Sequence, residues 1–239
     1  MWRLPCLAVL VGACSEPAPP QHALLFTRTL GYRHADAIEA SVPALTAALG
    51  THGVTVEATE DPAVFASLER FGAVVFLYTT GNDLLDDAGK VELERFVRDG
   101  RGWVGVHSAA DTEYAWPFYG ELVVAPFAGH PDIQPATIVV EGLGHPAMSG
   151  VPSPWTATDE WYDFARNPRD VSGVQVLATI DPASYAGSAM GDDHPMIWAH
   201  ERLGGRAVYT ALGHVAARWQ EPAFVDHVTA SVRWTLRSR

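Results

Sequence analysis

Residues 73–80, AVVFLYTT, form an apolar run whose first half has no polar face. A strand of this kind must be covered on both sides, as in a parallel sheet between helical layers. Further apolar runs lie at 23–29, 54–59 and 102–107, and polar or amphipathic segments separate them. This alternation of strand and helix patterns predicts a doubly wound α/β sandwich with a mostly parallel central sheet.

Two helices are expected between these strands. The first carries a row of apolar side chains at helical spacing, Ile38, Val42, Leu45 and Leu49. The second spans 86–98, where Asp86 or Asp87 can cap the free amides at its start. A last helix is expected near Pro222, because proline suits the first helical position.

The second half of the chain is less regular. Its strand candidates, at 137–142, 174–180, 196–201 and 206–213, are separated by Pro- and Gly-rich connections, and some are expected to pair antiparallel. No internal repeat or interdomain linker follows residue 22, and a chain of 239 residues suits one sizeable core. We therefore expect one domain over residues 23–239.

Residues 1–22 differ in character from the rest. They contain one cationic residue, Arg3, then an apolar stretch too short to span a bilayer, and then a Pro-rich polar spacer. The segment VGAC (11–14) resembles the bacterial lipobox, in which the cysteine is lipidated. We predict an exported protein, anchored through Cys14 to a bacterial membrane on its periplasmic or cell-surface side. A plain cleaved signal peptide and an apolar start on a cytosolic protein are the alternatives.

The net charge argues against one class of partner, and the cysteine content excludes three kinds of cysteine site. The net charge of −12, with no cluster of Lys and Arg, argues against a nucleic-acid partner. The only cysteines are Cys6 and Cys14, so the expected domain has no disulfide, Cys-rich zinc site or cysteine nucleophile.

Polar clusters follow the predicted strands, where open α/β sheets bind their ligands. In the clearest case, HSAADTE (107–113), a buried strand ends on a histidine that is followed by two carboxylates. Histidine titrates near neutral pH and carboxylates orient it, so this pattern is typical of acid–base chemistry. Taken alone, His34, His194 or His214 is explained more readily by a structural role, in closing a turn, fixing a bend or bonding a neighbouring loop. The other clusters with a histidine or a carboxylate are GYRH (31–34), TDEWY (158–162), DDHP (192–195) and GH (213–214).

Metal binding is the rival use of four of these residues, His107, Glu160, His194 and His214. Imidazole and carboxylate suit zinc and other divalent ions, but the sequence has no local ligand spacing such as His-Glu-x-x-His. The cofactor therefore stays unknown at this point, with a divalent metal as one alternative. Aromatic residues such as Tyr114 and Trp161 flank the clusters, where they either face a sugar ring or pack beneath the loops.

Seven blocks of sequence carry a family resemblance: FTRTLGYRH (26–34), VFLYTTGN (75–82), GVHSAADTEYAWPFYGELV (105–123), HPAMSGVP (145–152), TDEWYDF (158–164), GDDHPMIWAHE (191–201) and YTALGH (209–214). In order and spacing they resemble the ThuA-like family, named for trehalose utilisation, from about residue 23 to the end. That family is similar in fold to the class I glutamine amidotransferases, which are flavodoxin-like α/β sandwiches. Where those enzymes carry a cysteine nucleophile, this chain has His107, so amide hydrolysis through a thioester is excluded.

The resemblance implies a carbohydrate-processing enzyme that acts on a disaccharide or on its 3-keto derivative, which a partner sugar dehydrogenase would supply. A 3-keto group acidifies the neighbouring C–H, so that a base can start an elimination or an isomerisation; hydrolysis is the third alternative. On this hypothesis His107 or His214 takes the proton, and Glu160 or Asp159 protonates the leaving oxygen. The residues expected to bind or orient the sugar are Arg33, His34, Asp111, Tyr114, Trp161 and His194.

Two non-enzymatic hypotheses stay open. A lipoprotein could use the same edge of the sheet only to bind a sugar, with membrane contact only through its lipid anchor. An interaction module could use the aromatic loops as a docking face. The sequence alone does not fix the substrate, the product or the oligomeric state.

Overall fold

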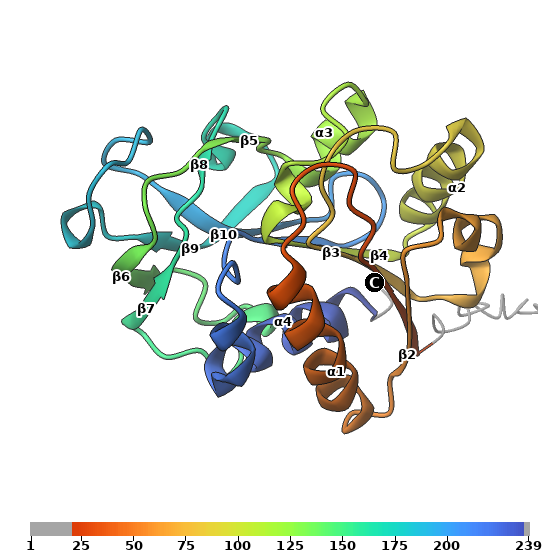
Figure 1. Cartoon of the computed structure of the whole chain (residues 1–239), viewed down its shortest axis with the longest axis horizontal. Coiled ribbons are helices and arrows are strands. Elements are labelled where there is room, and N and C mark those ends of the chain that lie inside the picture. The colour runs from red at the N-terminus through yellow and green to blue at the C-terminus, as the bar shows by residue number, and fades with distance from the viewer. Residues whose placement is uncertain (1–20, 237–239) are drawn as a thin grey trace, which may run out of the picture.

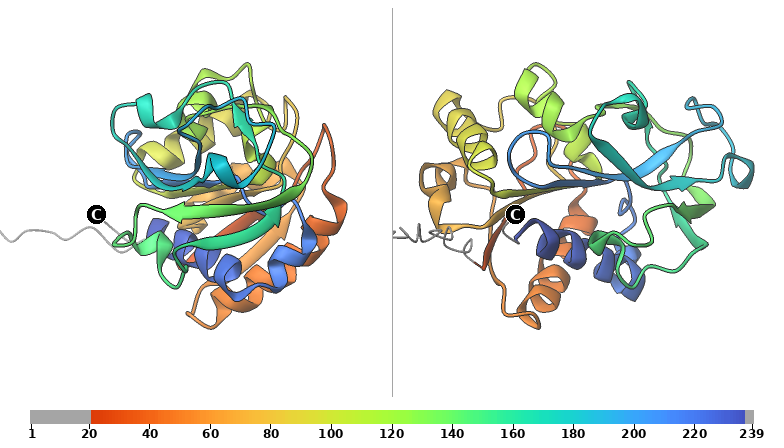
Figure 2. Two further views of the ribbon diagram at one scale, coloured as in Figure 1. Left: turned by 90° about the vertical axis from the view of Figure 1, so that its left-hand side faces the viewer. Right: turned by 180° about the vertical axis from the view of Figure 1, so that it is seen from behind.

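The computed structural model describes residues 21–236, and Figure 1 shows a central sheet between two helical layers. Helices α1 (Ala35–Gly50) and α4 (Pro222–Thr235) lie on one side of the sheet, and α2 (Asp87–Arg98) and α3 (Pro117–Val123) lie on the other. The view from behind in Figure 2 shows the same two layers. The predicted α/β sandwich is therefore confirmed.

The sheet of the described residues has nine strands. In spatial order they are β2 (Thr55–Thr59), β1 (His22–Phe26), β3 (Ala73–Leu77), β4 (Gly102–Val106), β11 (Ala207–Thr210), β10 (Pro195–His200), β9 (Val174–Ile180), β6 (Gln134–Val140) and β7 (Trp155–Asp159). The first five strands are parallel, and from β11 onward each neighbour is antiparallel. The sheet is thus parallel in its first half and antiparallel in its second, so that β7 runs in the same direction as β4 and β11.

Two predicted strands end earlier than their apolar runs suggest. Strands β3 and β4 are buried along their whole length, as expected for a sheet covered on both faces. They stop at Leu77 and Val106 because the next residues, Tyr78 and His107, have φ angles of 60° and 51°. This left-handed conformation ends a strand and is uncommon for residues other than glycine. The two adjacent strands therefore deliver Tyr78 and His107 side by side.

Several short elements escaped the sequence patterns. They are α3, β7, the two-stranded sheet of β5 (Phe127–Gly129) and β8 (Asp163–Phe164), and the 3₁₀ segments η1 (Pro62–Arg70), η2 (His107–Ala110), η3 (Pro146–Met148), η4 (Pro168–Asp170), η5 (Pro182–Ser184) and η6 (Ala216–Gln220). The expected helix starts are confirmed: Asp86 caps α2 by accepting a hydrogen bond from the Gly89 amide at 2.8 Å, and Pro222 begins α4. Helix α1 continues through Pro43.

The predicted lipidation site, Cys14, lies outside the described residues, and the anchor stays a prediction. Within residues 21–236, no helix combines the length and apolarity needed to cross a membrane.

Helix α4 buries a histidine whose titration affects stability. Burial lowers the pKa of His227 to about 4, and its Nδ1 donates to the Ala147 carbonyl at 2.9 Å. A histidine in the unfolded chain titrates near pH 6.5, whereas His227 in the folded chain titrates near pH 4. Between these two pH values the unfolded chain therefore binds a proton that the folded chain does not bind. The free energy of unfolding must therefore fall as the pH drops through this window.

We expect His227→Gln to remove this contribution. Its plot of unfolding free energy against pH, from urea titrations, should be shallower than that of the wild type by about 1.4 kcal/mol per pH unit in the window. His52→Gln, at an exposed position, should leave the slope unchanged. Equal slopes for the wild type and His227→Gln would refute the assignment.

Candidate active site

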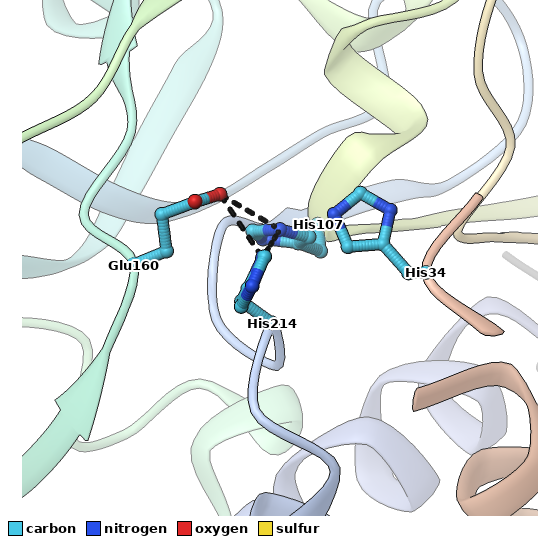
Figure 3. A group of neighbouring side chains, drawn as sticks. All are labelled: His34, His107, Glu160 and His214. Atoms are coloured by element: carbon cyan, nitrogen blue, oxygen red, sulfur yellow. Dashed lines mark hydrogen bonds and ion pairs between the residues drawn. The ribbon is translucent and has the colours of Figure 1, made fainter. Parts of the chain in front are cut away.

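Four ionisable side chains meet beyond the carboxyl ends of the strands (Figure 3). His107 follows β4, His214 comes after β11, Glu160 follows β7, and His34 lies between β1 and α1. Because β1, β4, β7 and β11 run in one direction, their carboxyl ends share one edge of the sheet. We call these four residues the histidine–glutamate cluster.

Three atoms of the cluster lie in mutual contact. His107 Nε2 lies 3.2 Å from His214 Nδ1 and 3.4 Å from Glu160 Oε2, and His214 Nδ1 lies 3.1 Å from the same oxygen. The ring of His34 packs edge-on against both other imidazoles, with centres 4.8 and 5.0 Å away. Segments that are distant in sequence thus build one compact site.

His107 is fixed by its backbone and by its second ring nitrogen. Its left-handed backbone is the kind of strain that structures retain at functional sites. Nδ1 donates to the Ala211 carbonyl at 2.7 Å, and the Tyr209 hydroxyl donates to the carbonyl of His107 at 2.7 Å. With the proton on Nδ1, the neutral ring presents the lone pair of Nε2 to the cluster. The ring of Tyr162, centred 4.2 Å away, covers the imidazole, which has no exposed surface.

Glu160 and His214 form a partly buried ion pair. Burial raises the pKa of Glu160, but the imidazoles of His107 and His214 beside the carboxylate outweigh burial and hold that pKa well below its usual value. Burial likewise lowers the pKa of His214, but its hydrogen bond to Glu160 and the carboxylate charge outweigh burial and raise that pKa. Near neutral pH the site therefore combines a carboxylate with an imidazole that readily holds a proton. The side chain of His214 is 20% exposed and that of Glu160 is 8% exposed, so the pair is open to solvent mainly at His214.

His34 contributes a neutral imidazole. Burial, followed by the charges of His107 and His214, lowers its pKa to about 3. Its Nδ1 lies 3.4 Å from the hydroxyl oxygen of Ser108, the residue after His107. The exposed ring of Tyr32 packs edge-on against it, with centres 4.8 Å apart. His34 therefore links the buried cluster to an aromatic surface.

Asp159 holds the loop that carries His214. Its carboxylate has no exposed surface and accepts hydrogen bonds from the amides of Gly213 at 2.7 Å and Val215 at 3.3 Å, on either side of His214. The guanidinium of buried Arg218 lies 3.4 Å away. The sequence predicts that Glu160 or Asp159 protonates a leaving oxygen; Asp159 lies buried against this loop and Arg218, and its part in catalysis stays a prediction.

Two predicted sugar-binding residues are buried, and their side chains hydrogen-bond to backbone carbonyls outside the cluster. The indole N–H of Trp161 donates to the Gln134 carbonyl at 2.9 Å, and His194 Nε2 donates to the Tyr162 carbonyl at 2.7 Å. Neither side chain has exposed surface. Both side chains are thus used in packing, and their expected contacts with a ligand stay a prediction.

The remaining predicted residues lie at the surface. Arg33 pairs with Glu60 at 2.6 Å, and the Tyr114 hydroxyl donates to Asp111 at 2.6 Å. The hydrogen bonds of the Arg33 and Tyr114 side chains run to Thr29, Glu60, Asp111 and the Phe127 carbonyl, outside the four cluster residues. The part of Arg33, Asp111 and Tyr114 in sugar binding stays a prediction.

Sequence reasoning missed His130, which contacts the cluster from the surface. Its Nδ1 lies 3.2 Å from Glu160 Oε1 and 2.9 Å from the Pro131 carbonyl, and its side chain is 40% exposed. Because both neighbours are acceptors, the neutral ring carries its proton on Nδ1 and keeps the lone pair on Nε2. The available signal was a histidine between Gly129 and Pro131 directly after a short strand.

The cluster also has the donor set of a metal centre. Three imidazoles and one carboxylate each offer one ligand atom, and these atoms lie within 4.8 Å of one another. Nitrogen-rich sets of this kind suit first-row transition ions, whereas magnesium and calcium prefer oxygen ligands.

Comparison with known proteins agrees with this architecture. A family model described as trehalose utilisation, ThuA, matches residues 22–235. A ThuA-like protein of Bacteroides uniformis superposes with a TM-score of 0.77 at 22% identity, covering 93% of this chain and 94% of that one. A ThuA-like protein of Parabacteroides merdae gives 0.72 at 19% identity, with coverages of 91% and 90%.

More distant structural matches include part of a larger enzyme. A β-galactosidase of Rahnella sp. R3 matches with a TM-score of 0.57 at 16% identity, over 93% of this chain and 32% of that one. No curated protein matches the chain in sequence. At these identities the structural matches establish the fold and nothing finer.

Proposed function

The chain belongs to the ThuA family of trehalose utilisation, which supports a carbohydrate-related function, and on that premise we propose that the histidine–glutamate cluster is the active centre of a carbohydrate-processing enzyme. The observation that carries the proposal is the largely buried pair of Glu160 and His214 beside two more imidazoles. Ionised side chains are costly to bury, and such clusters with shifted pKa values concentrate at functional sites.

The substrate that we propose is a disaccharide oxidised at C3. The ketone makes the proton on the adjacent carbon acidic, so that two modest groups suffice: a base for that proton and an electrophile for the ketone oxygen. The resulting enediolate either takes the proton back at the other carbon, which is an isomerisation, or expels the glycosidic oxygen, which is an elimination. No redox partner is needed at this step, because the oxidation belongs to the dehydrogenase that supplies the ketone.

The geometry favours particular residues for these tasks. His130 is the proposed base, because its Nε2 lone pair is free while its other ring nitrogen, Nδ1, faces Glu160 and the Pro131 carbonyl. His214 is the proposed proton donor to the ketone or leaving oxygen, since it holds a proton beside Glu160 and is partly exposed. His107, with no exposed surface, orients His214 and does not reach a substrate carbon itself. This assignment differs from the expectation that His107 or His214 is the base.

The sugar ring also needs an apolar face, and Tyr32 is a suitable one. Tyr32 is 67% exposed, and its ring packs edge-on against the ring of His34. Aromatic rings offer large contact area to the C–H surface of a sugar. Tyr114, which donates to Asp111, provides a second half-exposed ring.

Turnover of defined sugars tests the proposal. We expect the purified chain to convert 3-keto-trehalose and to leave trehalose unchanged, with products followed by NMR. Saturable binding of either sugar without any product would favour a non-catalytic sugar-binding protein instead. Neither binding nor turnover would favour an interaction module.

A further inference from the structure

We propose that the histidine–glutamate cluster binds one divalent first-row transition ion, through the imidazoles of His34, His107 and His214 and through Glu160 Oε2. This inference deepens the proposed function: it relies on that function for the role of the ion, but not for its binding.

Counting protons in the cluster gives the first reason. The Nδ1 proton of His107 is committed to the Ala211 carbonyl, so its Nε2 is an acceptor. A proton on His214 Nδ1 satisfies the contacts with Glu160 and with His107, but it leaves His107 Nε2 facing Glu160 Oε2 at 3.4 Å, acceptor against acceptor. Either a second proton, on His107, or a cation between the three atoms removes this repulsion. One cation satisfies all three contacts at once.

The distances give the second reason. Ligand atoms about 2.1 Å from a metal lie about 3.4 Å apart in a tetrahedral site and about 3.0 Å apart as neighbours in an octahedral one. The three mutual contacts of His107, His214 and Glu160 measure 3.1, 3.2 and 3.4 Å. The fourth proposed ligand, His34, offers an atom within 4.8 Å of the others and has to move closer to bind the same ion. The atoms of His107, His214 and Glu160 are thus spaced as ligands of one ion.

The outer contacts give the third reason. Metal-binding histidines usually donate their second N–H to a carbonyl or carboxylate, and ligating carboxylates are themselves hydrogen-bonded. His107 donates Nδ1–H to the Ala211 carbonyl, and His130 Nδ1 lies 3.2 Å from Glu160 Oε1, the oxygen away from the cluster. His34 Nδ1 contacts the Ser108 hydroxyl, which leaves its Nε2 for the ion. These supports orient the donor atoms before any ion arrives.

In the proposed reaction the ion would act on the ketone oxygen in place of a proton on His214. Held by His34, His107, His214 and Glu160, a divalent ion would supply a Lewis acid for the ketone oxygen of the sugar. His130 is outside the ligand set and stays free to act as that base.

Metal binding can be measured without any sugar. The full chain is freed of metal with a chelator and then titrated with Co²⁺, whose visible absorption reports imidazole ligation, and with Zn²⁺ by equilibrium dialysis. We expect one ion per chain and no comparable binding of Mg²⁺ or Ca²⁺. His214→Gln and Glu160→Gln should each weaken binding at least a hundredfold, and His52→Gln, which changes an exposed histidine, should not.

Several outcomes would overturn the metal site. No visible band and no bound Zn²⁺ would do so, and so would equal affinity in the wild type and the two cluster variants, provided that circular dichroism shows them folded. Turnover of 3-keto-trehalose separates the two proposals. Full turnover after metal removal contradicts the role of the ion and leaves the enzyme proposal intact, whereas tight one-to-one binding without turnover supports the metal site and contradicts the proposed function.

Discussion

Glu160→Gln should lower the turnover of 3-keto-trehalose by about a hundredfold or more while the chain stays folded. Glutamine keeps the size of the side chain but removes the charge that holds a proton on His214 and orients His130. It also removes the only carboxylate of the cluster. Initial rates measured by NMR at matched protein concentration, with circular dichroism as the check on folding, give the comparison.

Glu121→Gln is the matched control for this experiment. Glu121 pairs with Arg202 at 2.8 Å on the surface, and exposed ion pairs of this kind contribute little. Its turnover should stay within about twofold of the wild type, as expected for a surface change without contact to the site. If Glu160→Gln retains wild-type turnover as well, the cluster is not the active centre.

Asp159→Ala should lower the free energy of unfolding by about 3–5 kcal/mol, because it leaves the buried guanidinium of Arg218 without its buried carboxylate partner. Arg218 is 1% exposed, and Glu221 is its other carboxylate neighbour. The substitution also frees the amides of Gly213 and Val215, so that the loop bearing His214 loses its anchor. Urea unfolding measures the loss of stability.

Asp193→Ala provides the comparison for Asp159→Ala. Asp193 also pairs with an arginine, Arg169 at 2.8 Å, but both side chains are about two-fifths exposed. Removing an exposed pair of this kind should cost about 1 kcal/mol or less. A loss for Asp159→Ala no greater than that for Asp193→Ala would show that the buried pair does not hold the loop.

The parallel half of the sheet was predictable because its strands are buried on both faces. Runs such as 73–80 have no polar alternation, and few structures other than a covered sheet accommodate them. Their ends were not predictable to the residue, because the left-handed backbone of Tyr78 and His107 has no counterpart in hydropathy. The antiparallel half was harder. Strand β7 alternates buried and exposed residues, as a half-covered strand does, but it follows the stretch 151–154 with two prolines, which is typical of a loop.

The same reasoning explains which site residues were found. His34, His107, Glu160 and His214 come after strands that end at one edge, and topology alone brings them together. Burial and ring orientation are decided by packing that the sequence does not display. Of two neighbouring aromatic residues, Tyr162 covers His107 while Trp161 bonds to the Gln134 carbonyl.

His130 was missed for a related reason. It follows β5, a strand of three residues whose partner β8 has two, and elements this short leave no periodic signal. The sequence therefore did not predict that the loop carrying His130 lies at the edge of the sheet where the cluster forms. Asp159 and Glu160 show the reverse problem, since adjacent carboxylates look alike in sequence and only the fold separates the anchor of a loop from a member of the cluster.

Hydrogen exchange into a 3-keto sugar tests the central claim most directly. In D₂O, the wild-type chain should replace the proton on the carbon next to the ketone of 3-keto-trehalose by deuterium much faster than buffer alone, and His130→Gln should slow this exchange markedly. Loss of that proton at the buffer rate, in a folded chain that still binds the sugar, would contradict proton transfer at this site.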